Sequence, residues 1–323
     1  MKKVLFVGDN HIDDKQPENR SDNYLEATLN KLKECLTIAE EEKFDAIVFL
    51  GDIFDRREVG PLARNGTMKI LLNQDSGKPW SFPKYVVVGN HDIQSSHPLE
   101  NSSLGTLIHC GALIKTDYEP QLGIAFAHFH NDLDKEITNG FLTTNSAIIW
   151  ACHASIYNES TSYDSSVIVF DTLPLHPNNS IVISGHIHKP MEVLREDGKI
   201  FVNPGCIGRR SANKDNFDRD LKVFALEYEL DGKLLKKEYI HLLSAKNHTE
   251  VFKLDEIIEK KTQVKEAQEF IKHVSDIQAK NWINKTIEDK IQILTSYGEE
   301  KNIIKPVIDV AIDALNFVNM EKN

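Results

Sequence analysis

The sequence predicts an α/β fold with a smaller, mainly helical module toward its C-terminal end. Three observations support this prediction. Short apolar runs such as Ala46–Leu50 have the continuous hydrophobicity of strands that are buried on both faces of a parallel sheet. The segment Asn23–Lys43 lies between two such runs and carries apolar residues at helical spacing, which completes a β–α–β unit. From about Ser244 the chain becomes rich in Lys, Glu and Ile and poor in Gly and Pro, as amphipathic helices are.

The change of composition near Ser244 sets the expected domain boundary. We expect an α/β domain over residues 1–243 and a helical module over residues 244–323. A chain of 323 residues is long enough for one α/β domain of roughly 200–250 residues and a smaller module. The helical module is expected to cap a substrate or dock a partner helix, with a self-contained bundle as the alternative.

The other expected elements follow from the same two patterns, taken in chain order. The expected strands are Lys3–Gly8, Phe44–Leu50, Lys84–Val88, an edge strand starting at Ile114–Lys115, Gly123–Ala127, Ala147–Cys152, Ser180–Ser184, Lys199–Val202, Leu221–Glu229 and Leu234–Leu242. The expected helices include Asn23–Lys43, Leu62–Asn73, Ser103–Cys110 and Lys305–Val318. Asp231-Gly232 joins the last two strands and is a hairpin signal.

Composition and charge exclude several protein classes. The formal net charge of −11 argues against a protein that grips nucleic acid through a broad basic surface, so any DNA contact must be local or shared with a partner. No apolar run reaches ~18 residues, and the first apolar segment is too short for a signal peptide, so we expect a cytoplasmic protein without a membrane contact. The four cysteines form no C-x-x-C pair and are expected to be buried thiols in a reducing cytosol.

Acidic, amide and imidazole side chains follow many of the expected strands. In chain order these residues are Asp9, His11, Asp52, Asp55, Asn90, His91, Asp92, His153, His186 and His188. Open α/β sheets bind ligands at the carboxyl ends of their strands, so we expect these side chains to meet. Each short motif alone is weak evidence, because most such pairs are surface residues or turns. Their joint occurrence, each directly after an apolar strand, indicates a ligand site.

This residue set is suited to divalent metal ions. Hard oxygen donors mixed with imidazoles suit two ions such as Mn²⁺, Fe²⁺ or Zn²⁺. No cysteine lies at these strand ends, which argues against a structural zinc site. Two neighbouring ions need a shared ligand, and Asp52 is the expected bridge because it follows a central strand. Such a pair of ions activates water and polarises phosphoryl oxygens.

Five motifs together resemble those of the calcineurin-like metallophosphoesterases. They are Gly8-Asp9-Asn10-His11, Gly51-Asp52-Ile53-Phe54-Asp55, Gly89-Asn90-His91-Asp92, His153 and Gly185-His186-Ile187-His188, and the resemblance covers roughly residues 1–242. It implies a four-layer β-sandwich flanked by helices. It also implies two bound divalent ions, for which we expect Mn²⁺, with Mg²⁺, Fe²⁺ or Zn²⁺ as alternatives.

Within that superfamily the chain is most similar to the SbcD branch of DNA double-strand-break-repair nucleases. The Gly-Asp-Ile-Phe-Asp form of the second motif is one point of similarity. The second is a Ser-rich loop after the third motif that leads to a helix, made of Ser95, Ser96, Ser102, Ser103 and Leu104. The third is the segment Asn203–Arg209, which resembles the branch's Pro-Gly-Ser-x-x-Arg segment, with Cys206 where the family often has Ser.

The resemblance implies a role for each motif residue. The implied ligands are Asp9, His11, Asp52 and His188 for the first metal, and Asp52, Asn90, His153 and His186 for the second. His91 is implied to contact the scissile phosphate and to protonate the leaving oxygen. Asp55 is expected to hydrogen-bond His91 and to raise its pKa.

Two assignments keep alternatives open. His128 and His130 also follow an apolar strand and are rival candidates for the position given to His153. We prefer His153, because the next β-unit leads directly to the last motif. Phosphate contacts are expected from a set of arginines, for which ordinary surface charge is the alternative. These arginines are Arg56, Arg57, Arg209 and Arg210.

The implied activity is that of a two-metal DNA exonuclease or endonuclease subunit, acting in DNA recombination, repair or replication. Its implied partners are DNA and an SMC-like ATPase of the SbcC type, in a heterotetramer that contains a homodimer of this chain. The compact length and the acidic charge fit a phage-type member, which would work in the host cytoplasm. The alternatives are a metallophosphatase or cyclic-nucleotide phosphodiesterase with a small substrate, and a non-catalytic scaffold. The complete ligand set and His91 argue against a scaffold.

Overall fold

The computed structural model describes residues 1–93, 98–158, 168–212, 214–217, 219–277, 285–301 and 303–320. The chain divides into two compact units, Met1–Phe252 and Lys253–Asn323. This boundary lies beyond the expected one at residue 243. The reason is that the short helix α6 (His248–Val251) is tied to the first unit, where Ser21 N donates to Val251 O over 3.0 Å and Arg20 forms a bridge with Phe252.

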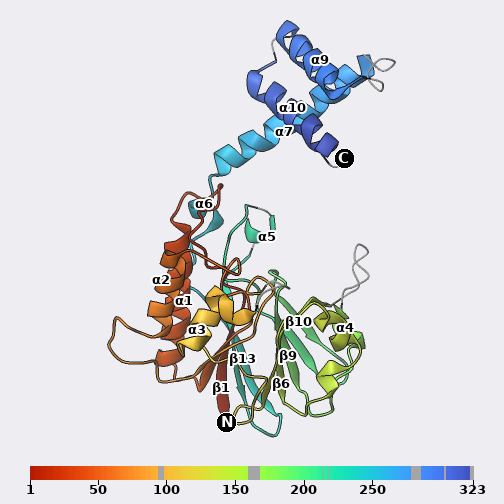
Figure 1. The fold of residues 1–323 in the computed structure, drawn as a ribbon. Helices are drawn as coiled ribbons and strands as arrows, with labels where there is room; N and C mark the ends of the chain where they lie inside the picture. The colour runs from red at the N-terminus through yellow and green to blue at the C-terminus, as the bar shows by residue number, and fades with distance from the viewer. Residues whose placement is uncertain are drawn as a thin grey trace. The chain divides into compact units, whose positions relative to one another are not determined.

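The first unit is built on two sheets (Figure 1). The five-stranded sheet has the order β13 (Leu234–His241), β12 (Lys222–Tyr228), β1 (Lys2–Val7), β2 (Ala46–Phe49), β3 (Lys84–Val86). In it β1, β2 and β3 are parallel, while β12 runs antiparallel to both β1 and β13. The carboxyl ends of β1, β2 and β3 therefore share one edge.

The six-stranded sheet has the order β10 (Met191–Leu194), β11 (Ile200–Asn203), β9 (Ile181–Gly185), β6 (Ile149–His153), β5 (Ile124–Ala127), β4 (Tyr118–Glu119). Its four central strands β11, β9, β6 and β5 are parallel, so their carboxyl ends also share an edge. A separate two-stranded pair consists of β7 (Ile156–Tyr157) and β8 (Ile168–Val169).

Successive side chains of a strand point to opposite faces of its sheet, and this alternation creates three packed layers of side chains. Val4 and Phe6 of β1 pack against Ile149 and Ala151 of β6 in the core between the two sheets. Leu5, the residue between Val4 and Phe6, belongs to the core that lies under the helices of the first sheet. The order of layers is helix, sheet, sheet, helix, which confirms the expected sandwich and fold class.

Helices close the two outer faces of the sandwich. The first sheet is covered by α1 (Tyr24–Glu41), α2 (Pro61–Leu71) and α3 (Ser103–His109). The second is covered by α4 (Leu133–Thr138) with the 3₁₀ turns η2 (Phe141–Thr143) and η3 (Phe170–Thr172). The remaining short elements of this unit are η1 (Leu99–Asn101) and α5 (Lys214–Phe217).

The structure corrects three expectations for the first unit. No strand starts at Ile114–Lys115: Ile114 forms only an isolated bridge with Tyr85, and the edge strand is β4. Strand β10 was not expected, because its Met-Glu-Val-Leu sequence lacks a continuous apolar run. Of the four cysteines expected to be buried, Cys110 is exposed at the end of α3. Ser95 and Ser96 of the expected Ser-rich loop lie outside the described residues.

Among its described residues, the second unit contains the helices α7 (Leu254–Ile277), α9 (Ile287–Glu300) and α10 (Lys305–Met320). They share a core of their own, formed by Ala267, Phe270, Val274, Leu294, Val307, Ile308 and Ala311. Both amphipathic helices and a self-contained core are thus present. Within the described residues, no helix is both long enough and apolar enough to cross a bilayer.

Candidate metal centre

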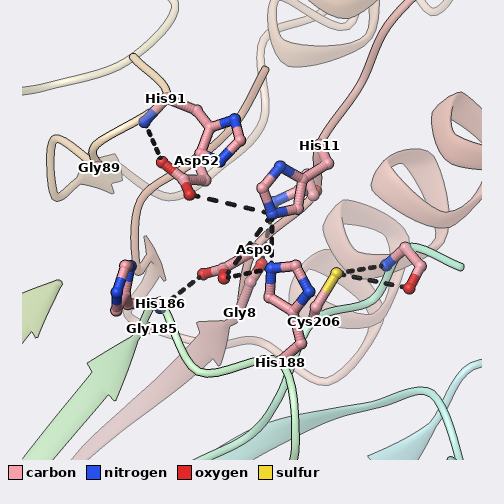
Figure 2. Close-up of polar contacts among 12 residues, drawn as sticks. Gly8, Asp9, His11, Asp52, Gly89, His91, Gly185, His186, His188 and Cys206 are labelled. Carbon is pink, nitrogen blue, oxygen red and sulfur yellow. Dashed lines mark hydrogen bonds and ion pairs between the residues drawn. The ribbon is translucent and has the colours of Figure 1, made fainter. Parts of the chain in front are cut away.

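Loops that leave both sheets bring the predicted ligands together at one end of the sandwich. Asp9, Asp52 and Asn90 follow β1, β2 and β3 of the first sheet. His153 ends β6 and His186 follows β9 in the second sheet. Figure 2 shows several of these side chains pointing toward one another. The candidate ligands therefore come from two facing sheets, rather than from the edge of a single open sheet.

One half of the site consists of Asp9, His11 and His188. The Nε2 atoms of the two histidines lie 2.9 Å apart, and Asp9 Oδ2 lies 3.5 Å from His188 Nε2 and 3.9 Å from His11 Nε2. Asp9 is buried, and its Oδ2 has no hydrogen-bond partner in the described parts of the chain. Two imidazole nitrogens and a buried, unpaired carboxylate oxygen that face one point form a donor set for a divalent cation.

The other half consists of Asn90, His153 and His186. Asn90 Oδ1 lies 2.9 Å from His153 Nε2 and 2.9 Å from His186 Nδ1. His153 is fully buried, and its other ring nitrogen, Nδ1, lies 2.8 Å from the carbonyl oxygen of Leu50. Because that carbonyl can only accept, it favours the tautomer in which Nδ1 carries the proton and Nε2 is free to bind a metal.

Asp52 lies between the two halves. Its Oδ2 is 3.9 Å from His11 Nε2 and 3.4 Å from His153 Nε2, while its Oδ1 accepts a hydrogen bond of 2.9 Å from the main chain of His91. This position is the one that a bridging carboxylate requires. The donor set as a whole fits two divalent ions, with Asp9, His11, Asp52 and His188 on one side and Asp52, Asn90, His153 and His186 on the other.

The protonation of these groups reflects their burial. Burial, together with the charge of Asp52, raises the pKa of Asp9 to about 7. Burial lowers the pKa of His11 to about 3. Burial also opposes ionisation of Asp52, but the nearby His153 outweighs it and holds the pKa of Asp52 below its usual range. A bound cation stabilises ionised carboxylates and neutral imidazoles, so it complements this site.

The main chain is unusual at three of the predicted ligands. His11, Asp52 and His186 have φ of 48°, 46° and 77°, in the left-handed region that L-residues seldom adopt. Such conformations cost about 1–3 kcal/mol each and persist where the surrounding structure enforces them, often at functional sites. Glycines allow the loops to approach: a Cβ on Gly51 would enter the ring of His153, and one on Gly89 would meet Asp52.

His91 stands beside the donor set, and the main chain orients its ring. His91 Nδ1 lies 2.5 Å from the carbonyl oxygen of Asp55. The expected contact from the carboxylate of Asp55 is therefore replaced by one from its main chain. The Asp55 carboxylate instead pairs with Arg210 and lies 3.5 Å from His11 Nδ1.

The rival histidines lie apart from the donor set. His128 Nδ1 accepts a hydrogen bond of 3.1 Å from Val88 N, and its Nε2 lies 3.1 Å from the carbonyl oxygen of Thr116. His130 pairs with Glu136 at 3.4 Å. The structure brings His153, rather than either rival, to Asp52 and Asn90.

The four arginines expected at phosphates have different surroundings. Arg210 lines a hollow together with His11, His91 and His188. Arg56 is half exposed and pairs with Asp13 at 2.8 Å, and Arg57 pairs with Glu58. Arg209 is only 7% exposed, and its guanidinium donates to main-chain carbonyl groups. Of these four residues, Arg210 is the one next to His11 and His91.

Two hollows border the site. One has a volume of 380 Å³ and includes His11, His91, Cys206 and Arg210 in its lining. The other has a volume of 580 Å³, and His186, Lys189 and Arg219 are among its lining residues. Both are lined by His188 and Asn216.

Asp92 is among the predicted strand-end residues, and the structure shows what it contacts. Its Oδ2 accepts hydrogen bonds from Asp52 N at 3.0 Å and Gly89 N at 2.9 Å, which fixes the loop that carries Asp52. Two other residues at the site, Tyr24 and Cys206, were not predicted as site residues. Tyr24 donates from its hydroxyl to the carbonyl of His11 over 2.7 Å. Cys206 reaches His11 and His188 through a turn rather than from a strand end.

Comparisons with known proteins agree with this geometry at the level of the family. Residues 2–190 match the family described as calcineurin-like phosphoesterase, which is more than half of the chain. No curated protein matches the chain.

Solved structures with a related chain path have low sequence identity. A hypothetical protein from Thermus thermophilus shows 14% identity over 74% of this chain and 98% of its own, with a TM-score of 0.42. A dimetal phosphatase from Danio rerio shows 12% identity over 74% and 98%, also with a TM-score of 0.42. A 5′-nucleotidase precursor from Thermus thermophilus shows 11% identity over 77% of this chain and 56% of its own, with a TM-score of 0.40.

Proposed function

The chain belongs to the calcineurin-like phosphoesterase family, and on that premise we propose that it is a metal-dependent phosphodiesterase that hydrolyses DNA. In this proposal it is the nuclease subunit of a recombination, repair or replication complex. The residues that would hold two divalent ions are Asp9, His11, Asp52, Asn90, His153, His186 and His188. Bound there, the ions supply Lewis-acid polarisation of the phosphoester and a water nucleophile with a lowered pKa.

The proposed acid is His91. Its Nδ1 lies against the carbonyl of Asp55, a contact that is satisfied when Nδ1 carries a proton. Nε2 is then the atom available to the substrate, and His91 lines the hollow of 380 Å³. A protonated His91 would donate from Nε2 to the leaving oxygen, while its position beside Asp52 keeps it close to the scissile phosphate.

The observation that carries the choice of a phosphodiester is the pair of hollows that meet at His188. A phosphomonoester needs room for one organic group, whereas a phosphodiester in a nucleic acid continues on both sides of the phosphorus. Two hollows of 380 and 580 Å³ that are both lined by His188 offer room for the second kind of substrate. Arg210 in one hollow and Lys189 in the other are cations of the kind that contact phosphate groups.

Further parts of the proposal rest on the resemblance to SbcD-type nucleases. They are Mn²⁺ as the working ion, an SbcC-type ATPase as partner, and a homodimer of this chain within a heterotetramer. The net charge of −11 supports a partner that shares DNA binding, because most of the surface repels the phosphate backbone. In the second unit, Ile258 of α7 is 63% exposed although the bundle has its own core, which leaves apolar surface for a docking helix.

The decisive experiment compares substrates under one set of conditions. The full chain with Mn²⁺ is given labelled linear duplex DNA, bis(p-nitrophenyl) phosphate and p-nitrophenyl phosphate, with and without the candidate ATPase. We expect hydrolysis of the duplex and the diester, and loss of both activities after treatment with a chelator. The variant His91→Ala, prepared identically, controls for contaminating nucleases. Activity confined to the monoester would replace the nuclease by a phosphatase, and no activity with both ions bound would favour a scaffold.

A further inference from the structure

Cys206 lies at the site, but it is neither one of the proposed metal ligands nor the proposed acid. It follows β11 and the turn at Pro204-Gly205, and it is 4% exposed. Its Sγ and one ring nitrogen of each of His11 and His188 all lie within 4.8 Å of one another. In Figure 2 the sulfur lies beside the ring of His188, on the side away from Asp9.

A second, independent observation indicates a cation at this point. Asp9 is 1% exposed, and its Oδ2 has no hydrogen-bond partner among the described residues. This oxygen lies 3.5 Å from His188 Nε2, one of the two imidazoles next to the sulfur. A buried carboxylate oxygen without a donor is costly unless a cation is bound to it. The thiol and this oxygen thus both lie near the same two imidazoles.

The main chain of its own turn holds the sulfur of Cys206. Gly208 N donates to Cys206 Sγ over 3.1 Å, and Sγ lies 3.4 Å from the carbonyl oxygen of Gly208. These two contacts fix the sulfur beside His11 and His188.

We propose that Cys206 is a ligand of the first metal ion, beside Asp9, His11 and His188. The proposal rests on the metal-dependent function proposed above and specifies its first ion. On binding, a bond forms between sulfur and metal, and the thiol proton passes to solvent. Sulfur favours softer cations, so the first position would take Zn²⁺ or Fe²⁺ in preference to Mn²⁺ or Mg²⁺. The second position, with only oxygen and nitrogen donors, would remain suited to Mn²⁺.

The test uses Co²⁺ as a spectroscopic substitute. Metal-free full-length protein is titrated with Co²⁺, the bound metal is counted by elemental analysis, and near-ultraviolet absorption is recorded. We expect an intense sulfur-to-cobalt charge-transfer band as the first ion binds. Cys206→Ser should abolish the band, whereas Cys110→Ser, which removes the exposed thiol at the end of α3, should retain it. The affinity of Cys206→Ser for Zn²⁺ should fall by at least the ~10–100-fold that loss of an outer-shell partner costs.

Failure of this inference is distinguishable from failure of the proposed function. Two bound Co²⁺ ions without the band, or a band that persists in Cys206→Ser, would overturn the role of Cys206 and leave the dimetal site standing. No bound Co²⁺ would overturn the dimetal site itself. X-ray absorption of the wild-type zinc protein needs no variant: a sulfur neighbour at about 2.3 Å from zinc is expected, and a shell of nitrogen and oxygen alone would refute it.

Discussion

At the scale of single residues, the site is held by main-chain conformations that L-residues seldom adopt. His11, Asp52 and His186 all have φ in the left-handed region. Hydrogen bonds from elsewhere in the fold stabilise these loops: Tyr24 donates to His11 O, and Asp92 accepts from Asp52 N. These hydrogen bonds hold the candidate donors in position, which is the support that metal ligands need.

His91 is the residue whose replacement separates chemistry from metal binding. Since His91 is the proposed proton donor, His91→Ala should lower turnover of the diester by about 10²–10⁴-fold. Turnover and metal content are measured on the same preparation, and His130→Ala is the matched control. We expect two ions in both variants. Loss of one ion in His91→Ala would place His91 among the ligands, since its ring lies in a group with His11 and Asp52.

Gly51 allows a second test at the scale of single residues. It has a φ of 108°, and a Cβ there would enter the ring of His153. Gly51→Ala should therefore weaken metal binding by at least ~10-fold, in addition to a backbone cost of about 1–2 kcal/mol. Gly198 has a φ of 81° in open space, so Gly198→Ala carries the backbone cost alone. Metal titration measures the affinity of each variant, and urea unfolding measures its stability. Equal metal affinities of Gly51→Ala and Gly198→Ala would contradict this prediction.

At the scale of elements, α1 is joined to the loop that carries Cys206 and Arg210. Lys31 of α1 is buried, and its Nζ donates to Ile207 O over 2.8 Å. Arg219 donates from Nη1 to the carbonyl of His188 over 2.8 Å. Buried cations thus support the main chain of the loops at the site. Their mutual repulsion and the loss of hydration are the cost of this arrangement.

Lys31 makes stability depend on pH. Burial, with the nearby Arg20, lowers the pKa of Lys31 from 10.5 to about 8. Between these values the unfolded chain binds a proton that the folded chain has released, so raising the pH through this window stabilises the folded state, by up to about 3 kcal/mol. In Lys31→Met the rise should be absent, whereas Lys33→Met, on the exposed face of α1, should retain it. The free energy of unfolding is measured with urea from about pH 7 to 10. The same pH dependence in wild type and Lys31→Met would refute the role of Lys31.

At the scale of the whole molecule, the chain contains a metal-binding sandwich and a separately packed helical bundle. The sandwich accounts for the donor set, because both sheets supply donors to it. The bundle has its own core around Phe270 and Leu294. We expect units with separate cores to lose stability separately.

Leu294 tests that independence. It is fully buried in the bundle, so Leu294→Ala should destabilise the second unit by about 2–5 kcal/mol. Ile258→Ala, at an exposed site on α7, should change stability by no more than about 0.5 kcal/mol. Hydrogen exchange should show lost protection in α9 and α10 of Leu294→Ala, with β1 and β2 and the metal affinity unchanged. Loss of protection in β1 and β2 would show that the two units unfold together.

The sequence alone determined the local features of this protein. Apolar runs located β1, β2 and β6 to within a few residues, because a buried strand needs continuous hydrophobicity. The polar residues after those strands, such as Asp52 and His153, were identified as candidate ligands for the same local reason, and their order led to the family. The roles expected for His91 and Asp55 came from the resemblance that these motifs carry, and the structure replaces the expected contact from the Asp55 carboxylate by one from its main-chain carbonyl.

Only the tertiary structure decided which strands share a sheet and what else reaches the site. The division into two sheets, which places His153 opposite Asp52, depends on pairings between distant segments that local periodicity does not encode. For the same reason, sequence did not show that the carbonyl of Asp55 orients His91, or that Cys206 lies beside His11. Burial of Arg209 was equally unpredictable, because a charged side chain becomes buried only where other segments offer carbonyl groups to it.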